Sequence, residues 1–296
     1  MNEAARANID VMILTLNEEV NLPHSLASVS EWARRVFVVD SGSTDRTHEI
    51  ARSFGAEVVD RPWLGYAKQK NWALDNLPFE SDWILIIDAD ESVMPDLKEK
   101  VLELVSRPVD SVDEAGFYIN RYFIFLGKRI RHCGYYPSWN LRLFKRGMAR
   151  YEEREVHEHM VVDGPTAYLK GHLEHDDRRG LEVYMAKHNR YSTLEAQEIY
   201  RKRKQAAGEQ IDAKLIGGGP LSRRRWIKHH IYPKLPVKWL ARFVFSYVLQ
   251  RGFLDGLTGL RFCLFLTAYE LLIDLKIKEL EIEEKRLGNE SSGDKR

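Results

Sequence analysis

The stretch "ILIIDADES" spans residues 84–92 and decides the fold class. It begins with an apolar run typical of a buried strand, and the run ends at Asp88 and Asp90. Burying an unpaired carboxylate costs on the order of several kcal/mol, so two acids directly after such a strand predict an exposed strand end or a bound cation. The choice between these depends on what the rest of the chain places beside them.

Similar apolar runs recur upstream and alternate with segments of helical spacing. The runs are "IDVMILTL", "RVFVVDS", "AEVVD" and "DWILIIDAD", and the helical segments lie near 20–34, 44–54, 66–77 and 95–106. Gly55 stands where the second helix should end, and Pro95 suits the first turn of the fourth. This alternation predicts an α/β domain with a mixed, mostly parallel sheet flanked by helices.

The residues after each apolar run form the candidate site, because ligands bind at the carboxyl ends of parallel strands. These ends are acidic or hydroxylic: Thr15, Asn17, Glu18 and Glu19 after the first run, Asp40, Ser43 and Asp45 after the second, and Asp88, Asp90 and Glu91 after the fourth. The glycine-rich patterns that cradle a bare phosphate are absent from the sequence. On an extended segment Asp88 and Asp90 would point the same way and together engage Mg²⁺ or Mn²⁺.

Four ordered motifs carry a family resemblance. "ILTLNEEVNL", "VFVVDSGSTDRT", "GYAKQKNWAL" and "WILIIDADE" resemble the nucleotide-sugar half of family 2 glycosyltransferases, which have the Rossmann-like GT-A fold. "GYYPSWNLRLFKRGMARYEEREVHEHM", "HLEHDD" and "KHNRYSTLEA" further resemble the lipopolysaccharide-core β-1,4-glucosyltransferase branch. The resemblance implies inverting, metal-dependent transfer of a hexose from a UDP-sugar donor to a lipid-linked saccharide such as lipopolysaccharide core.

The resemblance also implies residue roles. Asp40 would contact the base, Asp88 the ribose or a metal-bound water, and Asp90 the Mg²⁺ or Mn²⁺ ion. Lys70 stands where the family often has arginine, so a positive charge is kept near the nucleotide without a bidentate fork. The candidate nucleotide-sugar residues are Thr15, Leu16, Asn17, Glu18, Asp40, Ser43, Lys70, Asp88 and Arg142.

Inverting transfer also needs a base that takes the proton of the acceptor hydroxyl. If residues 154–162 are extended, Glu158 falls on their apolar face, where its pKa would be raised toward that of a general base. Glu158 is therefore the candidate base. The alternative is that Glu158 marks a turn or pairs with an arginine, and then Glu155 or Asp176 takes the role.

Two histidines and an arginine of the second half have competing interpretations. His172 and His175 follow an expected strand, and some family members use a late histidine as an extra metal ligand. His175, beside the turn "DDRRG", is the candidate third ligand, and a structural role is the alternative for either histidine. Arg142 is a candidate diphosphate contact, with a surface salt bridge as its alternative. The aromatic loop 135–140 would pack on a sugar ring or cover the core.

The C-terminal part is basic, aromatic and helical in pattern. Residues 201–251 contain thirteen Lys or Arg but two acids, with aromatic residues interleaved, which is typical of an interfacial membrane element. We expect a GT-A domain over 1–207, with halves at about 9–110 and 111–207, a linker at 208–220 and an amphipathic tail at 221–296. The tail would bind an anionic membrane surface through 221–273. Single charges break its apolar stretches, so we expect it to lie along a bilayer rather than cross it.

Other functions fit parts of the pattern. A polyprenyl-phosphate glycosyltransferase is one alternative, and a non-catalytic nucleotide-sugar or nucleic-acid binding protein is another. The sequence lacks a recognition helix, an RNP-like strand and zinc-ligand spacing, which argues against nucleic acid. Cys133 and Cys263 are far apart in sequence and the N-terminus lacks the pattern of a secretory signal, which predicts a reducing, cytoplasmic setting at the inner membrane. Nothing in the sequence indicates an oligomeric state.

Overall fold

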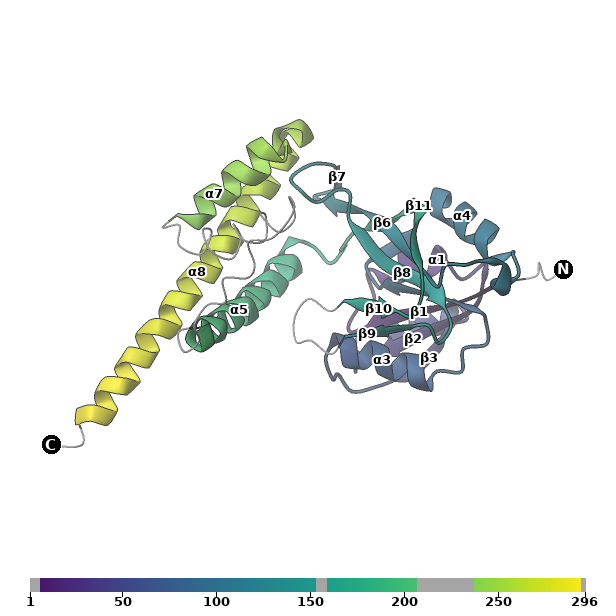
Figure 1. Ribbon diagram of the computed structural model, residues 1–296, viewed down its shortest axis with the longest axis horizontal. Helices are drawn as coiled ribbons and strands as arrows, with labels where there is room; N and C mark the ends of the chain where they lie inside the picture. The colour runs from purple at the N-terminus through teal and green to yellow at the C-terminus, as the bar shows by residue number, and fades with distance from the viewer. Residues whose placement is uncertain (1–5, 153–158, 207–236, 294–296) are drawn as a thin grey trace. The chain divides into compact units, whose positions relative to one another are not determined.

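The chain is described here by a computed structural model that covers residues 6–152, 159–206 and 237–293. It divides into two compact units (Figure 1). The sheet unit comprises Met1–Arg131 and Tyr135–Gly180, and the helical unit comprises His132–Gly134 and Leu181–Arg296.

The first half of the sheet unit alternates strands and helices, as the apolar runs predict. Its elements are β1 (Ala7–Thr15), α1 (Leu22–Ala27), β2 (Ala33–Asp40), α2 (Thr47–Ser53), β3 (Glu57–Asp60), α3 (Tyr66–Asn76), β4 (Trp83–Asp88), β5 (Glu91–Val93) and α4 (Pro95–Val105). Gly55 has φ +75°, so it takes the left-handed conformation that follows a helix end, and Pro95 opens α4. Strands β3, β2, β1 and β4 pair in parallel.

The second half adds strands to the same sheet. These are β6 (Gly116–Phe125), β7 (Lys128–Ile130), β8 (Trp139–Lys145) and β11 (Thr166–His175), preceded by a 3₁₀ turn at Val109–Ser111. The order is β3-β2-β1-β4-β8-β6-β11-β5, with β7 on β6. Here β6 and β11 are parallel, whereas β8, β5 and β7 join antiparallel. Strands β9 (Ala149–Tyr151) and β10 (Met160–Val162) form a separate pair. The predicted mixed sheet flanked by helices is confirmed.

Alternation along β1 builds the core on both faces of the sheet. Val11 and Ile13 point to the face that α1 and α4 cover, while Met12 points to the face that α3 covers (Figure 1). Helix α4 contributes Leu97 and Val101 to the first face, and α3 contributes Ala73 to the second. Because both faces are buried, the parallel strands read as continuous apolar runs.

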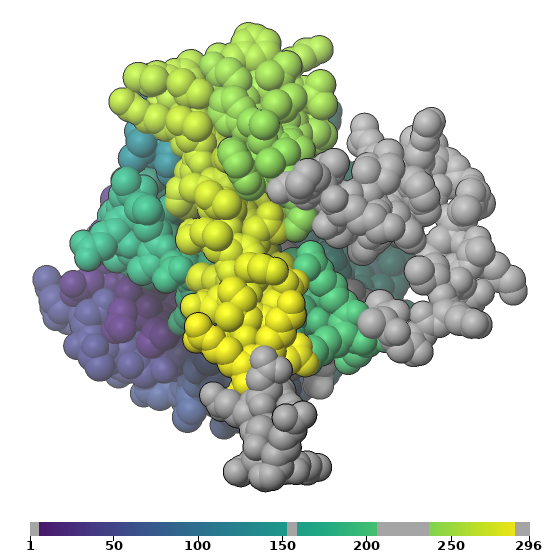
Figure 2. Space-filling model, turned by 90° about the vertical axis from the view of Figure 1, so that its left-hand side faces the viewer, coloured from purple at the N-terminus to yellow at the C-terminus, as the bar shows by residue number. Residues whose placement is uncertain are grey.

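The helical unit contains two long helices side by side. Its elements are α5 (Leu181–Ala206), α7 (Lys238–Val244), a π-helical turn at Phe245–Leu249, a 3₁₀ turn at Gly252–Asp255 and α8 (Gly256–Gly293). Ala196 of α5 packs with Ile273 and Ile277 of α8, and Figure 2 shows the two helices in contact. We expected α5 to belong to a domain ending at 207. The unit boundary instead follows Gly180, because Ala196, Ile199 and Tyr200 of α5 pack on α8. The expected linker 208–220 lies outside the described residues.

Helix α8 is long and apolar enough, by length and composition, to cross a membrane. Gly252–Leu287 spans 36 residues with an apolar window of mean hydropathy 1.4, of which 33% is buried. Arg261, one of the single charges that interrupt the apolar stretches, lies within this helix. Two buried thiols also meet in this unit: Cys133 and Cys263 are 130 residues apart, yet their sulfur atoms lie 3.5 Å apart. Burial raises the pKa of the Cys133 thiol, which keeps it protonated.

Candidate active site

Three neighbouring strands bring the predicted acidic ends to one edge of the sheet. Thr15 at the end of β1 pairs with Asp40 at the end of β2, and Leu14 pairs with Asp88 at the end of β4. The parallel register therefore places these residues side by side, although they are up to 74 residues apart in sequence. This edge is where a ligand of an α/β sheet binds.

Asp40 organises the loop after β2. Its Oδ1 accepts hydrogen bonds from the backbone N–H groups of Gly42 (2.9 Å) and Ser43 (2.6 Å), and its Oδ2 accepts from the hydroxyls of Thr15 (2.7 Å) and Ser43 (2.5 Å). Burial alone would raise the pKa of Asp40, but these bonds outweigh it and lower the pKa below its usual value. The carboxylate is thus ionised and ties the ends of β1 and β2 together.

The loop after β1 is locked onto the loop after β2. The N–H of Asn17 donates to Ser43 Oγ (2.7 Å), and the N–H of Thr44 donates to Asn17 Oδ1 (2.8 Å). Leu16, between Thr15 and Asn17, is exposed at this edge. Six of the nine candidate nucleotide-sugar residues thus lie on two interlocked segments: Thr15, Leu16, Asn17, Glu18, Asp40 and Ser43.

Asp40, His48 and Asp60 are three groups that could hold a metal ion, with ligand atoms within 4.8 Å of one another. His48 Nε2 lies 3.0 Å from Asp40 Oδ1 and 3.1 Å from Asp60 Oδ1, but its N–H is aligned with neither oxygen. Because both oxygens of Asp40 already accept bonds from its own loop, we assign His48 to the support of Asp40.

Asp88 sits in a buried network of opposite charges. Arg142 Nη2 donates to Asp88 Oδ2 (2.6 Å) and to Glu91 Oε1 (2.8 Å), and Arg121 Nη1 also donates to Glu91 Oε1 (3.0 Å). Lys70 Nζ lies 3.9 Å from Asp88 Oδ1. Burial opposes ionisation of Asp88, but Arg142 and Lys70 hold its pKa far below the usual range. The side chain of Asp88 is still 37% exposed, so a ligand can reach it.

Arg142 therefore differs from the surface salt bridge we considered. Its side chain is 7% exposed and is held by two carboxylates, which raise its pKa further. Glu91, to which the sequence pattern assigned no specific role, is fully buried. Its Oε2 also accepts a hydrogen bond from the N–H of Asp88 (3.0 Å). Arg142 and Glu91 together fix the orientation of Asp88.

We had expected Asp90 to continue the strand, but it does not. Strand β4 ends at Asp88, and Ala89 and Asp90 form a turn that leads into β5. The turn directs Asp90 to β11, where its Oδ2 lies 3.5 Å from His175 Nε2 and its carbonyl accepts the N–H of Asp176 (2.9 Å). The Asp90 side chain is 8% exposed. The two aspartates are thus placed by a turn rather than by strand alternation.

The structure separates the two candidate histidines. His172 Nδ1 lies 2.6 Å from Asp96 Oδ2, and its Nε2 lies 3.1 Å from the hydroxyl of Tyr136. Both nitrogens of His172 are therefore used, and its ring stacks on Tyr122 with centroids 4.0 Å apart. His172 anchors the aromatic loop 135–140. His175, in contrast, lies against Asp90 at the end of β11.

Asp90 and His175 offer a donor set that fits a divalent cation. Nε2 of His175 faces Asp90 and would be the ligand atom, while the buried Nδ1 makes no hydrogen bond within the described part of the chain. Carboxylate oxygen suits Mg²⁺ and Mn²⁺, and the added imidazole favours Mn²⁺. Asp88 precedes this turn at the end of β4. The base candidates Glu158 and Glu155 lie outside the described residues, and Asp176 is paired with Arg178 at 2.9 Å.

A second ion pair at this edge was not foreseen. Arg179 Nη1 donates to Glu18 Oε1 (2.8 Å), and its Nε and Nη2 donate to Asp177 at 2.8 and 2.7 Å. Asn21 donates to both Glu18 (2.8 Å) and Asp177 (3.1 Å). These bonds hold the turn "DDRRG" over the loop after β1. The run of two acids and two arginines was its only sequence signal.

Glu18 titrates near neutral pH. Burial raises its pKa to about 7, against the opposing effect of Arg179, whose charge is shared with Asp177. The folded protein thus keeps this proton up to about pH 7, whereas the unfolded chain releases it near pH 4.3. The free energy of unfolding should therefore fall by roughly 2 kcal/mol between pH 5 and 8 relative to Glu18→Gln.

Urea unfolding at pH 5, 6, 7 and 8 checks this difference. Glu49→Gln is the control, because Arg46 lowers the pKa of the exposed Glu49 and its titration ends below this range. Glu49→Gln should follow the wild type. Parallel curves for wild type and Glu18→Gln would contradict a raised pKa.

Comparisons with known proteins agree on one family. The profile of Glycosyl transferase family 2 matches residues 10–175. An uncharacterized glycosyltransferase of Rickettsia bellii is 30% identical over 227 residues, covering 73% of this chain and 76% of the relative. The lipopolysaccharide core biosynthesis glycosyltransferase LpsC of Rhizobium meliloti is 33% identical over 202 residues, covering 64% and 71%.

Solved structures are more distant. Glucosyl-3-phosphoglycerate synthase from Mycobacterium tuberculosis, crystallised with Mn²⁺, uridine diphosphate and glucosyl-3-phosphoglycerate, is 21% identical, covers 49% of this chain and 58% of that chain, and has a TM-score of 0.34. TarS of S. aureus in complex with UDP is 21% identical, covers 40% and 37%, and has the same TM-score. Likeness at this level carries no ligand to this chain.

The family match covers the whole edge described above. Residues 10–175 run from β1 to the end of β11, so they include the loops at Thr15 and Asp40, the Asp88 network, Asp90 and His175. The match therefore spans more than half of the chain and every strand that builds the site. The chain belongs to glycosyl transferase family 2.

Proposed function

We propose that this glycosyltransferase is inverting and metal-dependent, and that it moves a hexose from UDP-hexose to a lipid-linked saccharide such as lipopolysaccharide core. The observation that carries the proposal is the contact of Asp90 with His175 in the turn that follows Asp88, whose position Arg142 and Glu91 fix. The name of LpsC supports the acceptor class. The interlocked loops at Thr15–Ser43 would hold the nucleoside.

Each part of the edge has a role in this reaction. Asp90 and His175 would hold a divalent cation, with Asp88 facing the ribose or a metal-bound water. Such a cation neutralises charge on the departing diphosphate. Lys70, which is 9% exposed and 3.9 Å from Asp88, adds positive charge beside the nucleotide. Arg142 acts through Asp88 rather than by direct contact, because its guanidinium is already held by two carboxylates.

The transfer itself is a single displacement. The acceptor hydroxyl loses its proton to a carboxylate, for which we propose Glu158, and its oxygen bonds to the anomeric carbon from the face opposite the leaving group. The bond from that carbon to the diphosphate oxygen breaks, and the nucleoside diphosphate leaves with the electron pair. The configuration at the anomeric carbon is thereby inverted.

The acceptor class also suggests a location. Exposed apolar residues of the helical unit, among them Val248, Leu249 and Leu254, would let the protein associate peripherally with the anionic cytoplasmic face of the inner membrane. The basic tract at 221–236, which would add electrostatic attraction, lies outside the described residues. The described apolar surface supports the part of this proposal that depends on apolar contact with the bilayer.

A donor screen tests the proposed function. Purified protein is incubated with UDP-hexoses and other nucleotide sugars, with Mn²⁺, Mg²⁺ or a chelator, and with or without rough lipopolysaccharide. We expect nucleoside diphosphate release only with metal, highest for a UDP-hexose and stimulated by the acceptor. Full turnover in the chelator, or no release from any donor, would contradict the proposal.

The base has its own test. Glu158→Gln should lower kcat by about 10²–10⁴-fold, because general-base catalysis is lost, while the KM for the donor changes little. Asp176→Asn, which disrupts only the pair with Arg178, should keep most activity. Normal turnover in Glu158→Gln would transfer the role to Asp176 or Glu155, and the two single variants would then decide between them.

A further inference from the structure

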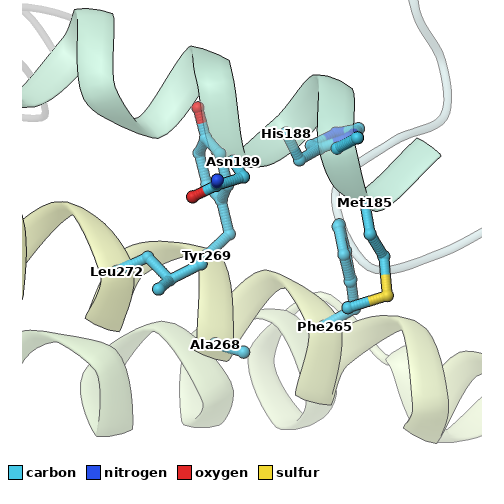
Figure 3. Close-up of a pocket in the computed structure, with 8 residues that line it drawn as sticks. Met185, His188, Asn189, Phe265, Ala268, Tyr269 and Leu272 are labelled. Carbon is cyan, nitrogen blue, oxygen red and sulfur yellow. The ribbon is translucent and has the colours of Figure 1, made fainter. Parts of the chain in front are cut away.

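An open pocket lies in the helical unit between α5 and α8. Its volume is about 350 Å³, which is at the lower end of small-molecule sites. Met185 and Leu272 are 52% and 38% exposed, so the pocket is reached from solvent. Its walls are Met185, Ala186, His188 and Asn189 from α5, and Phe265, Ala268, Tyr269 and Leu272 from α8 (Figure 3).

The polar atoms of the aromatic wall are directed to partners outside the pocket. His188 Nδ1–H donates to the carbonyl of Tyr184 (2.8 Å), and the Tyr269 hydroxyl donates to Glu195 (3.0 Å). The His188 ring packs edge-to-face on Phe265 and Tyr269, with centroids 5.0 and 5.6 Å away. A sugar bound against this wall would leave hydroxyl groups without hydrogen-bond partners, whereas a hydrocarbon chain has no hydrogen bonds to lose. The wall therefore fits a hydrocarbon.

A positive charge marks one end of this pocket. Lys276 lies one helical turn beyond Leu272, and its ammonium lies within hydrogen-bond distance of the carbonyl and side-chain oxygens of Asn189 (both 2.7 Å), Ser192 (2.8 Å) and Thr193 (2.7 Å), three of which its protons can bond at a time. All of these acceptors are neutral. In the ranges that the structure covers, no carboxylate lies within ion-pair distance of Lys276. An anionic group at this end would compensate the charge.

The surface around the pocket indicates where such a ligand would come from. Leu257, Leu264 and Leu275 of the same helix are exposed, and two thirds of the most apolar window of Gly252–Leu287 is unburied. An apolar surface of this extent, continuous with an apolar pocket that ends at a cation, matches the two parts of a membrane lipid.

We propose that the pocket binds one hydrocarbon chain of an anionic membrane lipid, with Lys276 facing the charged head group. The lipid would fix the helical unit at the bilayer surface. The pocket shares no residue with the donor site, and lipid binding requires no glycosyl transfer. Lipid binding can therefore be tested independently of the proposed reaction.

Fluorescence anisotropy with labelled lysophosphatidylglycerol, kept below its critical micelle concentration, tests the site in the full chain. We expect saturable binding at one lipid per protein, at least fivefold tighter than labelled lysophosphatidylcholine. Ala268→Trp fills the pocket from an exposed position and should weaken binding at least tenfold. Lys276→Gln should remove the preference for the anionic head, and Lys276→Arg should keep it.

Val183→Trp is the matched control, since Val183 is exposed on α5 but does not line the pocket, and it should bind as wild type. Circular dichroism confirms that each variant is folded, and Ala186→Trp fills the pocket from the opposite wall as a second variant. Wild-type affinity in both filled variants, or equal affinity for the two lipids, overturns the proposal. The proposal is also overturned if the wild type binds neither lipid and light scattering shows a dimer that the filled variants convert to a monomer. The pocket would then be covered by a second copy of this chain.

Discussion

Asp90→Ala is expected to lower kcat about a thousandfold or more while the protein remains folded. Asp90 is the carboxylate nearest to His175, and removing it would leave the cation with too few ligands to stabilise the departing diphosphate. Stability should be unchanged or slightly higher, because the charge of Asp90 also raises the pKa of the buried Glu18. Steady-state kinetics and urea unfolding on the same preparation measure both effects.

Asp110→Asn is the control for this variant, since Asp110 is an exposed aspartate in the 3₁₀ turn before β6. It should keep wild-type kinetics. The kcat of His175→Ala should lie between those of Asp90→Ala and Asp110→Asn. We expect a loss of about 10–100-fold, because the imidazole is the second of the two proposed ligands. More than a tenth of wild-type kcat in Asp90→Ala would remove Asp90 from the reaction.

Glu91→Ala is expected to cost about 3–5 kcal/mol of unfolding free energy. Glu91 is fully buried, and its loss leaves Arg121 without its carboxylate and Arg142 with Asp88 alone. The N–H of Asp88 also loses its acceptor. Asp88 would then be misplaced, so donor KM should rise even in the folded fraction.

Urea unfolding measures the loss of stability in Glu91→Ala. Glu103→Gln is a suitable comparison, because it breaks only an exposed, solvent-screened pair with Lys100 and should leave the stability nearly unchanged. A loss below about 1 kcal/mol in Glu91→Ala would mean that the buried network does not hold the end of β4 in place.

The strands and helices of the first hundred residues were predictable because β1, β2 and β4 are buried on both faces. A continuous apolar run such as residues 83–87 has few other interpretations between two helical segments, and glycine or proline marks the ends. The strand ends then follow from the topology, which is why Thr15, Asp40 and Asp88 were found together. Local sequence carries this information.

The network around Asp88 was not predictable in the same way. Arg142 is 54 residues from Asp88 and 51 from Glu91, and their contact depends on β8 pairing antiparallel with β4. Sequence spacing cannot show that adjacency, so Arg142 was open between a phosphate contact and a surface pair. The turn at Asp90 and the ion pair of Arg179 with Glu18 depend on tertiary contacts for the same reason.

Helical periodicity identified α5 but not its partner. An apolar stripe indicates that a helix packs against another element but does not identify that element. Ala196 could have faced the sheet or another helix. In the structure it faces Ile273 and Ile277 of α8, about 80 residues later. Similarly, the two cysteines looked unrelated in sequence but are neighbours between the loop after β7 and α8.

Isothermal titration of UDP in the presence of Mn²⁺ or a chelator shows whether a divalent cation joins Asp90 to the donor diphosphate. We predict that Mn²⁺ tightens UDP binding at least tenfold in the wild type and that Asp90→Ala abolishes this gain. Equal affinity with Mn²⁺ and with the chelator in the wild type would contradict it.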